Sequence, residues 1–231
     1  MSEKHFFGIA QGVHTGVTHV HKIGTNAAVG TNFEDIYDQG GKITLPTSAG
    51  VPDIASNLSN AGSIITIEGL DANYLEVSES LTLDSSGNAT GSQPFLRINN
   101  AFVSNDSAIS NVVRVTLDGS SGNQTRVEVA EQNSMQCIFT VPADKTAFLH
   151  QISVGIKTAS RDAEARLAVT EFGGVERTRA LIALPTGFAE KSYPIPLKFP
   201  QKTDIRLQAK TTGGDTVVTG SFDLVIVDNP L

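Results

Sequence analysis

Short runs of alternating apolar and polar residues, separated by turn-forming residues, recur along most of this 231-residue chain. In YLEVSESLTL (residues 74–83) the aliphatic side chains Leu75, Val77, Leu81 and Leu83 fall on one parity, with Glu76 and Ser78 on the other. A period of two residues is typical of a half-buried β-strand. No long stretch has a convincing helical period, so the pattern predicts an all-β fold.

The same reasoning predicts strands in both halves of the chain. We expect them in the middle over residues 63–70, 74–83, 95–103, 111–117 and 125–130. Later strands are expected over residues 137–141, 146–156, 164–172, 179–184, 193–199, 203–210 and 216–227. Pro194 and Pro196 restrict residues 193–199 to an edge strand or an extended connector. Many short strands divided by turn signals predict a β-sandwich or jelly-roll-like domain in each half.

Charge divides the chain into three parts. Residues 1–33 carry a net charge of +1, residues 34–131 carry −9, and residues 132–231 carry +1. We therefore expect an extended N-terminal arm over residues 1–33, an acidic β-sandwich domain over 34–133, and a second sandwich or jelly-roll-like domain over 134–231. Glycines interrupt every apolar run of the first 33 residues, so these residues contribute no core of their own. Removal of residues 1–33 should therefore leave both domains folded but weaken assembly.

The arm contains four of the five histidines, two of them in HVHKIG (His19–Gly24). In an extended segment His19 and His21 would lie about 6.6 Å apart on one face, a spacing that can suit a shared metal ion. The flanking glycines provide no rigid frame for oriented ligands, so we expect no metal site. We interpret the segment as a partner-binding surface, with these candidate residues: Val17, His19, Val20, His21, Lys22 and Ile23.

Catalytic chemistry is not indicated elsewhere. Glu76 and Glu79 fall on opposite strand faces, and Glu34 and Asp35 are neighbours in sequence only. The chain has no Trp for sugar platforms and none of the nucleotide, serine-hydrolase or zinc-protease motifs. The loops DSSGN and DGSSGN are explained by turn chemistry rather than by calcium binding, and the single cysteine, Cys137, by core packing. We expect no enzyme and no cofactor; a polysaccharide-cleaving enzyme is the alternative.

Two classes of partner are disfavoured by charge and hydropathy. A net charge of −7 argues against binding to nucleic acid, which requires clustered Lys and Arg. No window approaches the roughly 18 apolar residues of a membrane span, and the N-terminus lacks the apolar region of a signal peptide. The four Asn-X-Ser/Thr triplets are therefore expected to be turns rather than glycosylation sites.

Several motifs resemble a family of virion structural proteins of tailed bacteriophages, chiefly marine and cyanobacterial ones. The resemblance spans roughly residues 19–227 and rests on HVHKIGTN and FEDIYDQGG (both within residues 19–41), ITIEGLDANYLEVSESLTL (65–83), PFLRINNAFV (94–103), FTVPADKTAFLHQISVGI (139–156) and KFPQKTDIRLQAK (198–210). Ile23, Tyr37 and Asp144 stand where the family typically has Phe, Trp and Gly. None of these motifs is catalytic.

The resemblance implies a non-enzymatic part of a phage particle, assembled in the host cytoplasm. A two-domain β body suits a capsid decoration or cement protein that binds the major capsid protein and forms a homo-oligomer, with a trimer favoured. The alternative is a neck, collar or tail-associated protein that contacts the host.

Overall fold

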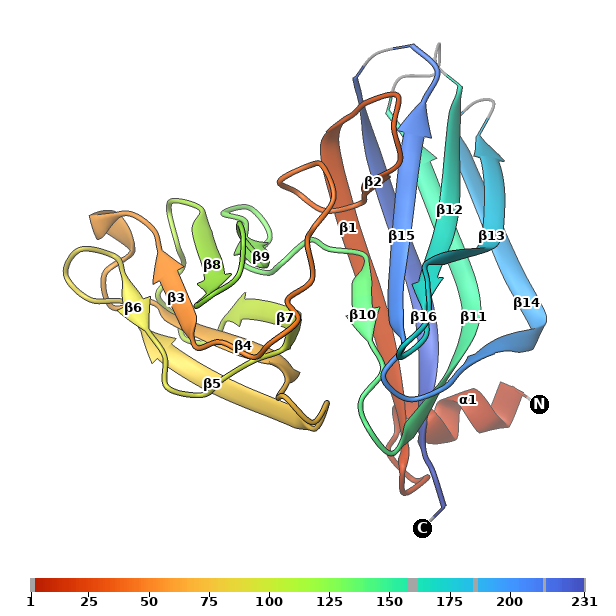
Figure 1. Ribbon diagram of the computed structural model, residues 1–231, viewed down its shortest axis with the longest axis horizontal. Helices are drawn as coiled ribbons and strands as arrows, with labels where there is room; N and C mark the ends of the chain where they lie inside the picture. Colours follow the sequence, from red (N-terminus) through yellow and green to blue (C-terminus); the bar gives the residue numbers. More distant parts are fainter. Residues whose placement is uncertain (1–2, 158–161, 185–186, 214, 231) are drawn as a thin grey trace.

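The computed structural model describes residues 3–157, 162–184, 187–213 and 215–230, and its fold is all-β, as predicted (Figure 1). All pairings between the described strands are antiparallel. The helices of the described residues are α1 (Glu3–Ala10) and the short 3₁₀ helix η1 (Leu58–Asn60). The strands form two lobes that lie side by side along the longest axis of the molecule.

The large lobe is a sandwich of two sheets. One sheet has the strand order β1 (Val17–Val29), β16 (Thr216–Asp228), β11 (Lys145–Ile156), β14 (Phe188–Phe199). The other has the order β10 (Ile138–Thr140), β15 (Asp204–Thr211), β12 (Ala163–Thr170), β13 (Arg177–Leu184), with β2 (Glu34–Asp35) also paired to β15. Chain segments more than a hundred residues apart therefore share each sheet.

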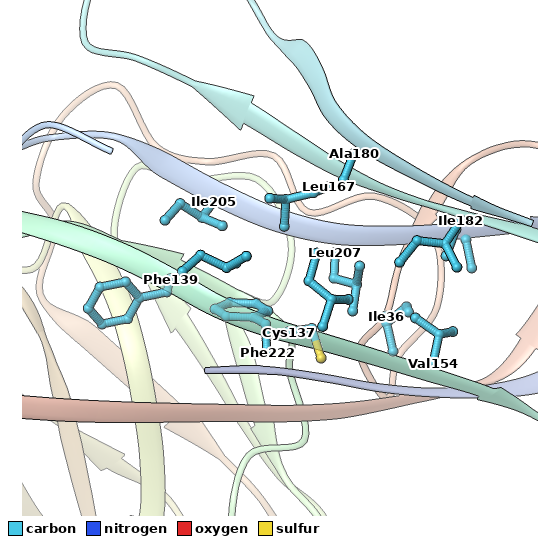
Figure 2. Packing of buried hydrophobic residues seen from close by; sticks show 14 of the residues in the cluster. Ile36, Cys137, Phe139, Val154, Leu167, Ala180, Ile182, Ile205, Leu207 and Phe222 are labelled. Carbon is cyan, nitrogen blue, oxygen red and sulfur yellow. The ribbon is translucent and has the colours of Figure 1, made fainter. Parts of the chain in front are cut away.

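Apolar side chains from both sheets fill the space between them. Figure 2 shows Phe139, Leu207 and Phe222 packed together in this core. Full burial of side chains of this size stabilises the fold by about 1.5–3 kcal/mol each. Cys137 is also fully buried, and its Sγ lies 3.0 Å from the Gly220 carbonyl oxygen. Its place in this cluster confirms the prediction of a core cysteine, and burial raises the pKa of the thiol.

The middle lobe is a smaller sandwich with a core of its own. Its sheets have the orders β6 (Ala89–Thr90), β3 (Pro52–Ala55), β8 (Val113–Leu117), β9 (Thr125–Val127) and β5 (Glu76–Thr82), β4 (Ile64–Leu70), β7 (Arg97–Val103). Phe95, Ile67 and Val115 are buried between them. The DSSGN loop is a turn, as predicted, because Asp84 Oδ1 accepts hydrogen bonds from the backbone N–H groups of Ser86 and Asn88.

Residues 17–29 are extended, as expected, but they do not form a separate arm. They are strand β1, which pairs with β16 from Val17↔Val227 to Val29↔Thr216. Val29 is fully buried in the core of the large lobe. Gly24 is needed here because a Cβ atom would lie 2.4 Å from the Ile36 carbonyl oxygen. The separate arm over residues 1–33 is therefore a wrong prediction, whereas independent folding of two domains divided near residue 133 stays a prediction.

Strand β14 is an edge strand, which confirms the constraint from its two prolines. Its pairing with β11 jumps from Leu149↔Leu197 to Gln151↔Ser192. Residues 193–196 thus lie opposite His150 alone and form a bulge.

Candidate partner-binding cleft between the two lobes

The free edge of β1 lines a cleft between the lobes. In the strand order of the described residues β1 lies at the end of its sheet, with β16 as its neighbour. An edge strand presents unpaired backbone N–H and C=O groups on its outer side. Residues 18–23 of β1 form one wall of a cavity of about 530 Å³. The cleft therefore combines open main-chain hydrogen-bonding groups with side chains from both lobes.

The opposite wall comes from the middle lobe. Strands β4, β5 and β7 provide Glu68, Val77 and Asn100 to it. Asn100 Nδ2 donates to Glu68 Oε2 at 3.4 Å, which orients the Glu68 carboxylate. Glu76, also on this wall, accepts an ion pair at 2.8 Å from Lys145 Nζ of the large lobe. The cleft is thus lined by apolar side chains, by carboxylates and by a lysine.

Lys22 ties the two walls together. Its side chain is buried, and Nζ donates a hydrogen bond of 2.5 Å to the Asn99 carbonyl oxygen on β7. Burial lowers the pKa of Lys22 to about 8, while the charges of Cys137 and Glu68 act in the opposite direction. A lysine with a lowered pKa can act as a nucleophile or base. Here the amine is already bound to a carbonyl oxygen, so its role is to hold β1 against the middle lobe.

The two histidines of HVHKIG point to the outer face of the sheet, away from Lys22. His19 Nε2 and His21 Nδ1 lie 3.1 Å and 2.8 Å from the same oxygen, Asp223 Oδ1, on β16. Both side chains remain about half exposed, so their contact with a partner stays a prediction. Burial, and then the charge of His19, lowers the pKa of the nearby His150. Across the described ranges, no group of three or more His, Cys, Asp or Glu side chains could hold a metal ion.

The apolar candidates of the segment differ in accessibility. Val20 packs against the core of the large lobe and Val17 is half-buried, whereas Ile23 is 37% exposed in the cleft. Five of the six predicted residues, from His19 to Ile23, line the cleft; Val17 does not. Of the apolar candidates, Ile23 is thus the one that a partner can reach from the cleft.

The carboxylates weighed for hydrolysis have structural partners. Asp35 is fully buried and accepts hydrogen bonds from Arg206, from Gln208 Nε2 at 2.9 Å and from the Ile43 N–H at 2.8 Å. Glu34 accepts from the backbone N–H groups of Gly30 and Gly41 at 3.3 and 3.0 Å. Both residues therefore fix the loop after β2.

A second set of residues also holds the lobes together, and the sequence pattern did not predict it. Arg97 on β7 forms two hydrogen bonds with Asp204 on β15, and Thr140 Oγ1 also donates to Asp204 at 2.6 Å. Asn99 and Thr140 exchange a pair of hydrogen bonds at 2.9 and 3.1 Å. The Arg97–Asp204 and Asn99–Thr140 contacts cross from one lobe to the other, and Thr140 supports Asp204 from within the large lobe, so the cleft walls form a fixed unit.

Another contact between the lobes carries a shifted carboxyl group. Asp38, after β2, lies beside Glu128 and Arg126 of the middle lobe. Burial, followed by the charge of Glu128, raises the pKa of Asp38 to about 7, although Arg126 acts against this shift.

Within the described residues, no helix is long and apolar enough to cross a membrane.

No family model matches the chain, and no curated protein matches it. Solved structures of infectious bursal disease virus are 12% identical: T=1 particles (TM-score 0.26, covering 93% of this chain and 70% of that chain), the Gt strain (0.24, 93% and 73%) and a VP2 subviral particle (0.25, 92% and 72%). A likeness at these TM-scores carries no argument about what this chain does.

Proposed function

We propose that this chain is a non-enzymatic structural protein of a tailed-bacteriophage virion, which decorates the head by binding the major capsid protein. The motif resemblance over residues 19–227 supports the virion assignment. The observation that carries the binding role is the open edge of β1, which lies along a cleft with walls fixed by contacts between the lobes.

The binding mode follows from the chemistry of that edge. An extended segment of the capsid protein adds to β1 as a further strand, so main-chain hydrogen bonds provide affinity. Ile23 on β1 and Val77 on the opposite wall provide apolar contacts beside it. A rigid cleft keeps the ordering cost of this association low.

The experiment is co-sedimentation of the purified full chain with assembled capsids of the phage that encodes it. Ile23→Lys places a charge on the open edge, a device that blocks strand addition. We expect it, and Val77→Lys on the facing wall, to reduce capsid binding at least tenfold. Ala27→Lys is the matched control, because Ala27 is exposed on the same strand but outside the cleft.

The outcomes separate the alternatives. Capsid binding by Ala27→Lys but not by the two cleft variants supports the proposal. Equal binding by all three variants overturns the role of the cleft. Binding of the wild-type chain to isolated necks or tails but not to capsids transfers the role to those parts of the particle.

A further inference from the structure

The edge of the large lobe furthest from the cleft exposes apolar side chains, and we call the more exposed of them, Ile195, the apolar knob. Ile195 is 86% exposed on the bulge of β14, and Phe188 on the same strand is 65% exposed. Pro194 and Pro196 flank Ile195, and each fixes its own φ angle and lacks an N–H group. The knob is thus held in place before any partner binds, which lowers the entropy cost of burying it.

Strands β13 and β14, which form this edge, carry basic side chains. Residues 177–199 carry four basic residues and one acidic residue, and the four cations are all exposed: Arg177, Arg179, Lys191 and Lys198. We call the surface formed by these four residues, Phe188 and Ile195 the basic edge.

The middle lobe has the opposite charge. Residues 44–131 contain ten acidic and three basic residues. Asp53, Asp84, Asp106, Asp118 and Glu131 are exposed there. Leu58 on η1 adds an apolar side chain that is 70% exposed. The middle lobe therefore offers both kinds of group that complement the basic edge.

The two surfaces cannot meet within one molecule. Figure 1 places β13 and β14 at one end of the long axis and the middle lobe at the other. Contact between unlike surfaces on two copies is heterologous, and it closes into a ring or continues as a chain.

We propose that the basic edge of one copy binds the acidic middle lobe of a second copy, head to tail. The inference deepens the proposed function by naming the surface through which copies associate in the virion. It uses none of the β1 cleft, so a failure of either proposal is distinguishable from a failure of the other.

The test is sedimentation velocity of the full chain and three variants, with folding of each verified by circular dichroism. Ile195→Asp removes the knob, and the triple variant Asp106→Lys, Asp118→Lys and Glu131→Lys reverses charge on the middle lobe. Val13→Asp is the control, because Val13 is 67% exposed and precedes β1, outside both surfaces. We expect wild type and Val13→Asp to associate, and added salt to weaken this association. Each of the other variants alone should be monomeric.

Mixing the two defective variants decides the geometry. The intact basic edge of the triple variant should bind the intact middle lobe of Ile195→Asp and give a one-to-one heterodimer. The proposal is overturned if the wild-type chain stays monomeric up to its solubility limit. It is also overturned if Ile195→Asp associates like wild type, or if the mixture remains monomeric.

Discussion

Arg97 of the middle lobe and Asp204 of the large lobe form a bidentate ion pair, with Nε–Oδ1 and Nη2–Oδ2 distances of 2.9 and 3.1 Å. The two side chains are only 9% and 10% exposed. Such a pair has the planar geometry in which arginine binds a carboxylate most strongly. It fixes the relative position of the lobes, and so the width of the cleft between them.

Removing one partner of this pair should be costly. We expect Arg97→Met to lower the free energy of unfolding by about 3 kcal/mol, because Asp204 is left buried without its cation. The double variant Arg97→Met, Asp204→Leu should show a smaller decrease in the free energy of unfolding than the single variant Arg97→Met, because it leaves no buried carboxylate without its cation. Urea denaturation of both measures this difference, and equal losses would contradict the coupling.

Lys22 should make stability rise with pH. Its pKa falls from an ordinary value of 10.5 to about 8 in the folded chain, so the unfolded state binds more protons between these values. The penalty for the buried cation is about 3 kcal/mol below pH 8, and it disappears as the pH rises to about 10.5. Lys22→Met removes the titrating group.

The readout is the difference in unfolding free energy between wild type and Lys22→Met across this range. Groups common to both proteins cancel in that difference. The unfolding free energy of wild type should rise relative to that of Lys22→Met from about pH 8 upwards. A constant difference would show that the buried amine has an ordinary pKa.

Asp38 should make stability fall as the pH rises, which is opposite to the effect of Lys22 and occurs at lower pH. Its folded pKa of about 7 lies above the ordinary value of 3.8, so the folded state binds more protons between these values. The stability associated with neutral Asp38 is present below about pH 4 and is lost as the pH rises through 7. Asp38→Asn should be more stable than wild type above pH 7, on the order of a few kcal/mol. Thermal melting at pH 4 and pH 8 checks this, and a pH-independent difference would refute it.

Deleting residues 1–29 should unfold the large lobe. The deletion exposes the edge of β16 and removes Val29 from the core and Lys22 from its bond to Asn99. We expect loss of cooperative melting in the large lobe. If the deletion variant melts like the full chain, residues 1–29 are not needed for folding, and the interpretation of a separate arm is correct after all.

The local pattern was enough to predict most strands, and β1 shows where it fails. The period of two is a property of neighbouring residues, so β4, β11 and β16 could be predicted from it. On β1 the inward positions include Lys22, Gly24 and Asn26, which are buried for particular contacts rather than for hydrophobicity. An apolar pattern cannot reveal such a strand.

The candidate site was predictable only in part, for a related reason. The segment His19–Ile23 could be selected from the sequence, but its surroundings depend on residues far away in the chain. Lys22 meets Asn99 across 77 positions, and Arg97 meets Asp204 across 107. Neither pair leaves a local signal, because each residue alone is an ordinary strand residue.

The proposed role in a tailed-phage virion is tested most directly by quantitative mass spectrometry of purified phage particles. We expect this chain in the intact virion, at a copy number close to that of the major capsid protein. A few copies per particle would contradict decoration and favour the neck or tail. Absence of the chain from purified particles would contradict a virion structural role altogether.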